Sequence, residues 1–179
     1  ATAGDASDFG NLTQARRNVT GVSSPTRSVF MGGRISGDTA SDILDFVTIA
    51  STGDATDFGN LTSSRWLMGG GVSSGTRSVF AGGSIVTSGN PTTNVLDYVT
   101  TQSLGNAVDF GDEQSTVYSR GASSNSTRGV LSGGYGTPND KLMEFFTIHT
   151  TGNGVDFGEL NRGGFGRAGT SSPITGLHA

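Results

Sequence analysis

The sequence predicts an all-β fold built from about four similar sheets, each made of four short antiparallel strands. One observation is a phrase around Asp-Phe-Gly that recurs at intervals of about 50 residues, as GDASDFGNL, GDATDFGNL, GNAVDFGDE and GNGVDFGEL. The other is that apolar residues come in short runs, such as SVFMGG, ILDFVTI and NVLDYVTT, separated by segments rich in Gly, Ser and Thr. Helical segments are not expected, because Gly and β-branched residues interrupt every window of helical length.

Composition and charge exclude several classes of protein. The chain has 179 residues, which is enough for one domain with its own core. Its net charge of −4 gives no electrostatic footprint for nucleic acid. It has no cysteine, which excludes disulfides and Cys-based zinc sites. No apolar run approaches the roughly 20 residues that span a bilayer. We therefore expect no membrane insertion, and from the net charge we expect no nucleic-acid partner.

One repeat unit divides into four predicted strands. In chain order they lie in WLMGGGVSS, TRSVFAGG, NVLDYVTT and NAVDFGD. In the second strand, alternation puts Val79 and Ala81 on one face and Ser78 and Phe80 on the other. The Gly-Gly pair that ends this strand permits positive φ and a close approach of neighbouring backbone. Four strands in about 50 residues are typical of one blade of a β-propeller, in which stacking buries both faces of each blade.

The repeats divide the chain into a single domain over residues 1–179. Its full units are expected at about 14–61, 62–112 and 113–160, with part-blades at 4–12 and 162–179. The terminal pieces predict a fourth blade, in which strands from both ends close the ring. The alternative is an open arc that is completed by oligomerisation, because exposed strand edges favour association.

Residues that recur in every unit are expected to hold the scaffold. They are Phe9, Phe58, Phe110 and Phe157, Arg27, Arg77 and Arg128, and the pairs Gly32–Gly33, Gly82–Gly83 and Gly133–Gly134. For the arginines, an ion pair with an aspartate of the Asp-Phe-Gly phrase is favoured over a ring of anion-binding groups.

Residues in the connection after each Gly-Gly pair vary between units, and variable loops are where binding residues are expected. The candidate binding residues are Arg34, Asp38, Asn90, Asn94, Tyr135, Asn139 and Asp140.

No catalytic set or cofactor site stands out, and the chain is not expected to be an enzyme. The Asp-Phe-Gly tripeptide lacks the HRD and VAIK sequences of protein kinases, and no GxSxG occurs. Carboxylates three residues apart, such as Asp54 and Asp57 with Asn60, offer oxygen ligands for calcium. We favour the alternative in which the first acid makes a turn and the second caps or pairs with a neighbour, so neither metal nor cofactor is expected.

The order of these features resembles the kelch repeat: a strand ending in Gly-Gly, a variable loop, an apolar strand with Tyr or Phe, then an aromatic residue before a leucine. Kelch repeats usually carry Trp in the fourth strand, where this sequence has Phe, so the match is kelch-like. The wording GNAxDFGxLT and TRxVFxGG more closely resembles repetitive kelch-like proteins encoded by aquatic bacteriophages. That resemblance implies an extracellular, virion-associated protein whose partners are itself, other structural proteins of the same assembly, and host-surface glycans.

Three functions follow as hypotheses. The first is a non-enzymatic structural or adhesive module, such as a virion decoration, tail appendage or fibre component. The second is a soluble carbohydrate-binding, lectin-like propeller, which needs an aromatic platform on one loop face, where Tyr135 is the only candidate. The third is a propeller enzyme, which needs a carboxylate pair about 5–10 Å apart facing the central channel.

Overall fold

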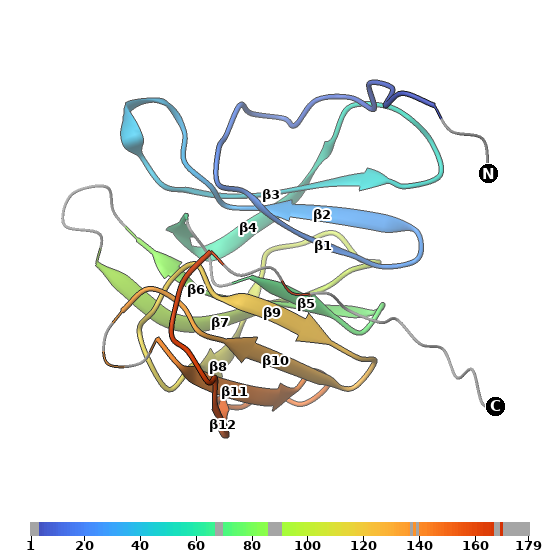
Figure 1. Cartoon of the computed structure of the whole chain (residues 1–179). Coiled ribbons are helices and arrows are strands. Elements are labelled where there is room, and N and C mark those ends of the chain that lie inside the picture. Colours follow the sequence, from blue (N-terminus) through green and yellow to red (C-terminus); the bar gives the residue numbers. More distant parts are fainter. Residues whose placement is uncertain are drawn as a thin grey trace.

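The computed structural model describes residues 4–66, 70–85, 91–136, 138, 140–166 and 169, and of Asp38 only the backbone. Within these residues the chain is all-β, apart from one 3₁₀ turn, η1, at Ser36–Asp38. Figure 1 shows the strands gathered into sheets that lie one above another, with the chain passing from one sheet to the next.

Twelve strands lie within the described residues. They are β1 (Thr20–Ser23), β2 (Arg27–Met31), β3 (Ser41–Thr48), β4 (Thr56–Arg65), β5 (Gly71–Ser73), β6 (Arg77–Ser84), β7 (Thr92–Thr100), β8 (Val108–Asp112), β9 (Gly121–Ser124), β10 (Arg128–Ser132), β11 (Leu142–Thr147) and β12 (Val155–Glu159). They form three four-stranded antiparallel sheets in simple chain order, which we call the first sheet (β1–β4), the middle sheet (β5–β8) and the third sheet (β9–β12).

Alternation along the strands sends side chains to two different cores, as the sequence predicts. In β6, Val79 and Ala81 join a cluster with Leu131 and Phe146 of the third sheet. Phe80, between them, joins a second cluster with residues of the first sheet. We call the face of a sheet that is turned to the next sheet along the chain its front face, and the opposite face its back face.

Backbone bonds to the Asp-Phe-Gly phrases join residues 4–12 to the first sheet and each sheet to the next. Gly53 N–H donates to the carbonyl of Phe9 at 2.8 Å, Gly105 N–H to Phe58 at 2.9 Å, and Gly152 N–H to Phe110 at 2.8 Å. The glycine after the first three phenylalanines has a φ of +143° and lies against the backbone of the next link, so a Cβ there would clash. This close approach explains why the phrase ends in glycine.

The prediction of about four blades is not confirmed. The described residues form three sheets and none of them closes the stack. Residues 4–12 lie over the back face of the first sheet without belonging to a strand. The outer faces are left uncovered in part: Phe9 is 38% and Phe157 50% exposed, whereas Phe58 and Phe110, inside the stack, are each 2% exposed.

Candidate functional site

Each sheet contains one buried arginine that pairs with a buried acid. Arg16 pairs with Asp45 in the first sheet and Arg65 with Asp97 in the middle sheet, and all four side chains are fully buried. The same guanidinium groups donate to backbone carbonyls of β3 or β7 and of the Gly-Gly pair, as in the 2.8 Å bond from Arg65 to Val95. These arginines therefore fasten the Gly-Gly turn to the neighbouring strand.

A threonine of the repeated Asn-Leu-Thr sequence binds the same acid. Thr62 donates to the Asp97 carboxylate through its hydroxyl at 2.7 Å and through its N–H at 3.1 Å. Thr13 occupies the equivalent position against Asp45. Burial lowers the pKa of Arg65, and the opposing attraction of Asp97 is the next largest influence.

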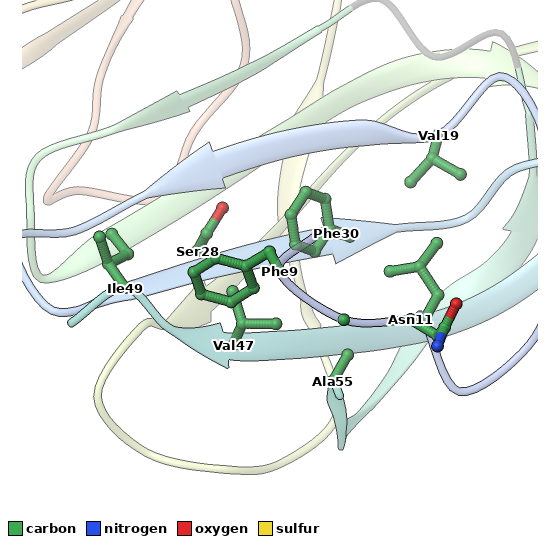
Figure 2. A pocket seen from close by; sticks show the side chains of 10 residues that line it. Phe9, Asn11, Val19, Ser28, Phe30, Val47, Ile49 and Ala55 are labelled. Atoms are coloured by element: carbon green, nitrogen blue, oxygen red, sulfur yellow. The ribbon is translucent and has the colours of Figure 1, made fainter. Parts of the chain in front are cut away.

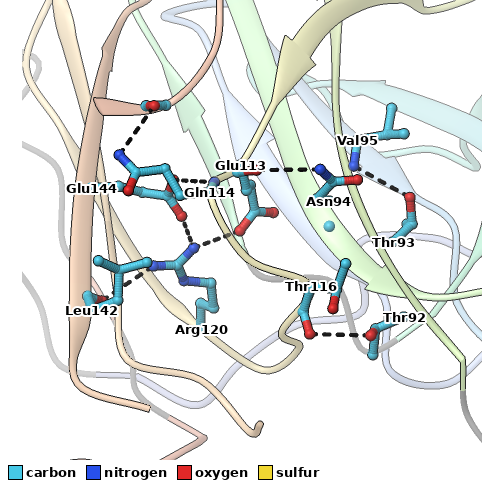
Figure 3. Close-up of polar contacts among 12 residues, drawn as sticks. Thr92, Thr93, Asn94, Val95, Glu113, Gln114, Thr116, Arg120, Leu142 and Glu144 are labelled. Atoms are coloured by element: carbon cyan, nitrogen blue, oxygen red, sulfur yellow. Dashed lines mark hydrogen bonds and ion pairs between the residues drawn. The ribbon is translucent and has the colours of Figure 1, made fainter. Parts of the chain in front are cut away.

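In the third sheet one arginine serves two acids. Figure 3 shows Arg120 between Glu113 and Glu144, with a further bond from the guanidinium to the carbonyl of Leu142. Burial raises the pKa of Glu113 to about 8, because desolvation outweighs the attraction of Arg120 and Glu144 adds like-charge repulsion. One carboxylate oxygen of Glu113 has no hydrogen-bond partner in the described part of the chain.

Both glutamates of this group are buried. Glu113 is 3% exposed and Glu144 is fully buried, and neither lines either of the two cavities described below. From the sequence we singled out Arg27, Arg77 and Arg128 and missed all three buried arginines. Their signal was an arginine shortly before the first strand of each unit, in QAR, SSR and YSR.

The arginines predicted as scaffold take aromatic partners instead of aspartate. Arg27 stacks on Phe46 at 4.7 Å and Arg77 on Tyr98 at 4.3 Å, measured from guanidinium carbon to ring centroid. Arg128 stacks in the same way on Phe145, at 4.5 Å. The predicted ion pair with the phrase aspartate was wrong, because the aromatic ring of the neighbouring strand lies directly under the guanidinium.

The first two of these arginines also reach the following sheet. Arg27 donates to the carbonyl of Thr101 at 3.3 Å, and Arg77 donates to the carbonyl of His149 at 3.0 Å. They are therefore clamps between successive sheets.

The phenylalanines predicted as scaffold make edge-to-face pairs with these same rings. Phe58 pairs with Phe46 and Phe110 with Tyr98, each at 6.0 Å between centroids, and Phe157 pairs with Phe145 at 5.8 Å. All six predicted scaffold glycines have positive φ, between +46° at Gly82 and +120° at Gly134.

The oxygen groups considered for calcium accept hydrogen bonds from the preceding segment or sheet. The Asp54 carboxylate accepts from the N–H and the side-chain amide of Asn11, and Asn106 accepts from Asn60 N–H at 3.0 Å. The second acid of each phrase forms the turn, as in the 3.2 Å bond from Gly59 N–H to Asp57. The turn was therefore predicted for the wrong acid. Among the described residues, no group of three or more His, Asp or Glu side chains is placed to hold a metal.

The predicted loop residues have four different outcomes. Asn90, Asn139 and the side chain of Asp38 lie outside the described residues. Asn94 lies in β7, where its backbone and its amide bind the backbone of Glu113, so its assignment to a binding loop was wrong. Arg34 stacks on the buried ring of Trp66, with its guanidinium carbon 4.3 Å from the centroid.

Tyr135 and Asp140, by contrast, come together beside an exposed aromatic group. They line a cavity of about 290 Å³ with Phe165, Gly134, Gly136 and Gly164. The Tyr135 ring lies 5.0 Å from that of Tyr118 and 5.2 Å from that of Phe165. Tyr135 is 51% and Phe165 65% exposed, which leaves their rings open to a ligand.

Two of these aromatic residues were missed from the sequence, where Tyr135 was the only candidate for such a platform. Tyr118 forms an isolated bridge with Tyr135, and Phe165 lies in the segment after β12. Burial and the neighbouring Tyr135 raise the pKa of the Tyr118 hydroxyl. The arrangement offers a short aromatic platform with one carboxylate at its edge.

A larger cavity, of about 430 Å³, lies on the back face of the first sheet. Phe9 covers it in part, and its floor includes Phe30, Val47 and Ile49 (Figure 2).

No protein-family model matches the chain, and no curated protein matches it either. The described residues include no helix with the length and apolar character needed to cross a membrane.

Proposed function

We propose that the three sheets are successive blades of a kelch-like propeller arc, and that the chain is a non-enzymatic structural or adhesive module of an extracellular assembly. A bacteriophage virion, with the module as a decoration, tail appendage or fibre component, is the assembly that the sequence resemblance favours. The module would hold its loops rigidly for contact with a partner or host surface.

The observation that carries this proposal is the use of the repeated polar groups. The buried Arg–acid pairs brace the interior of their sheets, and the backbone bonds from Gly105 to Phe58 and from Gly152 to Phe110 join successive sheets. None of these residues lines either of the two cavities. The third sheet has the one carboxylate pair that shares an arginine among the described residues, and that pair is buried. A scaffold role accounts for these groups without a reaction.

An antibody raised against the chain tests this role. It is applied to intact particles purified from the culture medium of the source and viewed by electron microscopy. We expect discrete label at a fixed place on the particles. Label confined to the cell interior, with bare particles, would contradict the proposal.

A second function, carbohydrate binding, is favoured by the aromatic platform of Tyr118, Tyr135 and Phe165 with Asp140 beside it. Sugar rings stack their C–H faces on aromatic side chains, and a carboxylate accepts bonds from hydroxyl groups. This placement meets the requirement for an aromatic platform that the sequence alone left unmet.

A glycan array tests this second function with three proteins: the wild type, Tyr135→Ala, and Phe9→Ala as a control at an exposed aromatic residue outside the platform. We expect at least a tenfold loss of signal for Tyr135→Ala and none for the control. Equal signals from all three proteins, or no signal from the wild type, would exclude the platform as a sugar site.

A further inference from the structure

The molecule makes the same contact between sheets twice, once between the first and middle sheets and once between the middle and third sheets. Each contact joins the front face of one sheet to the back face of the next. The outer faces of the stack are one further front face, on the third sheet, and one further back face, on the first sheet. On the front side, Phe58 and Phe110 are buried under the next sheet, whereas their third-sheet counterpart, Phe157, is half exposed. On the back side, Ile148 is fully buried, whereas its first-sheet counterpart, Ile49, is 44% exposed. One uncovered front face and one uncovered back face therefore remain.

The glycines and arginines of the front faces show the same difference between the inner sheets and the third sheet. A Cβ on Gly59 or Gly111 would meet the backbone of the following link, but a Cβ on Gly158 would have no atom of the described residues within 4 Å. Arg27 and Arg77 donate to carbonyls of the next sheet, and Arg128 occupies the matching place on the third sheet. The third sheet thus carries the full set of groups for one more contact.

The matching place on the first sheet is held by residues 4–12. This segment is bound by the N–H groups of Gly53 and Ala55 and by the Asp54 carboxylate, but belongs to no sheet. Figure 2 shows Phe9 beside Phe30 and Val47, over the strands of the first sheet, and the cavity of about 430 Å³ remains at this place. The segment fills the site incompletely.

We propose that the chain associates with a second copy of itself, head to tail, by strand exchange. The front face of the third sheet in one copy covers the back face of the first sheet in the next copy, and β12 takes the place of residues 4–12. This inference rests on the proposed role as an assembly module, and it names the partner and the surface.

The exchange is favoured by what β12 brings with it. β12 contains Val-Asp-Phe-Gly-Glu, and the segment that it displaces contains the matching Ser-Asp-Phe-Gly-Asn. After the exchange, the N–H groups of Gly53 and Ala55 would donate to the carbonyls of Phe157 and Glu159 in place of those of Phe9 and Asn11. β12 also arrives with three further strands and the rings of Phe145 and Phe157, so more apolar surface is buried than residues 4–12 bury alone.

One pair opposes the exchange. Asp54 now accepts from Asn11, and Glu159 would take the place of Asn11. The two internal contacts pair Asn60 with Asn106 and Asp112 with Asn153, and neither places two acids together. Replacing Glu159 by Asn should therefore tighten the association by several-fold.

The test is the solution mass, measured by light scattering after size-exclusion chromatography up to millimolar concentration. The variants are Ile49→Asp, which alters only the back face, and Phe157→Asp, which alters only the front face. We expect the wild type to exceed the 18.2 kDa of one chain, and each variant to be a monomer. A 1:1 mixture of the two variants keeps one intact pair of faces, and should give a species of two chains.

Matched controls separate folding from docking. Leu104→Asp changes an apolar side chain that is 57% exposed outside both faces, and should associate like the wild type. Circular dichroism should show the same β content for all variants. A closed ring and an open filament would both support the proposal, since a head-to-tail contact can build either.

A wild type that stays monomeric throughout, or a mixture of variants that stays monomeric, would overturn the proposal. Particle labelling in the absence of self-association would remove this inference alone. Self-association without particle labelling would leave the interface standing and remove the proposed function.

Discussion

Arg16, Arg65 and Arg120 bring a positive charge into the interior of each sheet, and each charge is balanced there by an acid. A buried ion pair is weak evidence for net stability, because desolvation offsets much of the attraction. Removing one partner is costly, however, since it leaves a buried charge unpaired. The role that fits is to fix the position of the Gly-Gly turn, whose carbonyls the first two of these arginines bind.

Glu113 should make stability depend on pH. Its pKa rises from 4.5 to about 8 on folding, so the folded state holds this proton more tightly. The stability from this proton is complete below the pKa of the unfolded chain and is lost as pH rises toward 8. We expect the free energy of unfolding in urea to fall by about 1 kcal/mol per pH unit between about pH 5 and pH 8.

Glu113→Gln is the matched variant, because the glutamine stays neutral beside Arg120 and Glu144. Its unfolding free energy should be nearly flat over the same range. The same slope in both proteins would show that Glu113 does not carry the effect.

A comparison of Arg77 with Arg128, at equivalent positions, separates the contribution of aromatic stacking to stability from that of hydrogen bonds to the next sheet. Both stack on an aromatic ring, but only Arg77 donates to carbonyls of a following sheet, those of Ile148 and His149. We expect Arg77→Ala to cost about 2 kcal/mol and Arg128→Ala about 0.5–1 kcal/mol, by urea denaturation. Equal costs would mean that the stacking alone matters.

At the scale of elements, the glycines of the Asp-Phe-Gly phrase determine how closely sheets approach. Gly59 and Gly105 both have φ near +145°, but a Cβ on Gly59 would meet the backbone of Gly105, and one on Gly105 would meet no atom within 4 Å. We expect Gly59→Ala to destabilise by about 3 kcal/mol, and Gly105→Ala by about 1 kcal/mol from backbone strain alone. Thermal unfolding checks both, and similar costs would show that strain and not contact governs the site.

The strands were predictable because their signal is local. Val79 and Phe80 alternate within one short run, and the recurrence of the Asp-Phe-Gly phrase sets the length of the unit. The partners of Arg27 and Arg77 were not predictable, because the repeat unit offers both an aspartate and an aromatic ring as a partner for the arginine. The register of β2 with β3, or of β6 with β7, decides which of the two lies beside the guanidinium.

The aromatic platform depends on long-range placement for a similar reason. Phe165 reaches Tyr135 only because the chain after β12 returns to the end of the Gly-Gly turn, where Gly134 N–H donates to Gly164 at 3.0 Å. The sequence pattern does not indicate that the chain after β12 comes back to this turn. The fourth sheet expected from the two terminal pieces is not confirmed, since the described residues complete three sheets and most of residues 167–179 lies outside them.

At the scale of the whole molecule, the stack behaves as a series of sheets in which each contacts its chain neighbours. Stability in such a series is approximately a sum of unit and interface contributions, so the unit with two interfaces should open last. The middle sheet has both faces covered, by the cluster around Phe80 on one side and that around Val79 on the other. We therefore expect amide hydrogen exchange to be slowest in β6 and β7.

The matched comparison is between β6 and its counterparts β2 and β10, which have similar sequences and the same place in their sheets. Under native conditions, protection in β6 should exceed that in β2 and β10 by at least tenfold. Uniform protection in a monomer would mean that the stack opens as one unit. If wild-type chains associate, β2 and β10 should gain protection as concentration rises, while Phe157→Asp keeps them at the monomer value, because the outer faces are then covered only in the wild type.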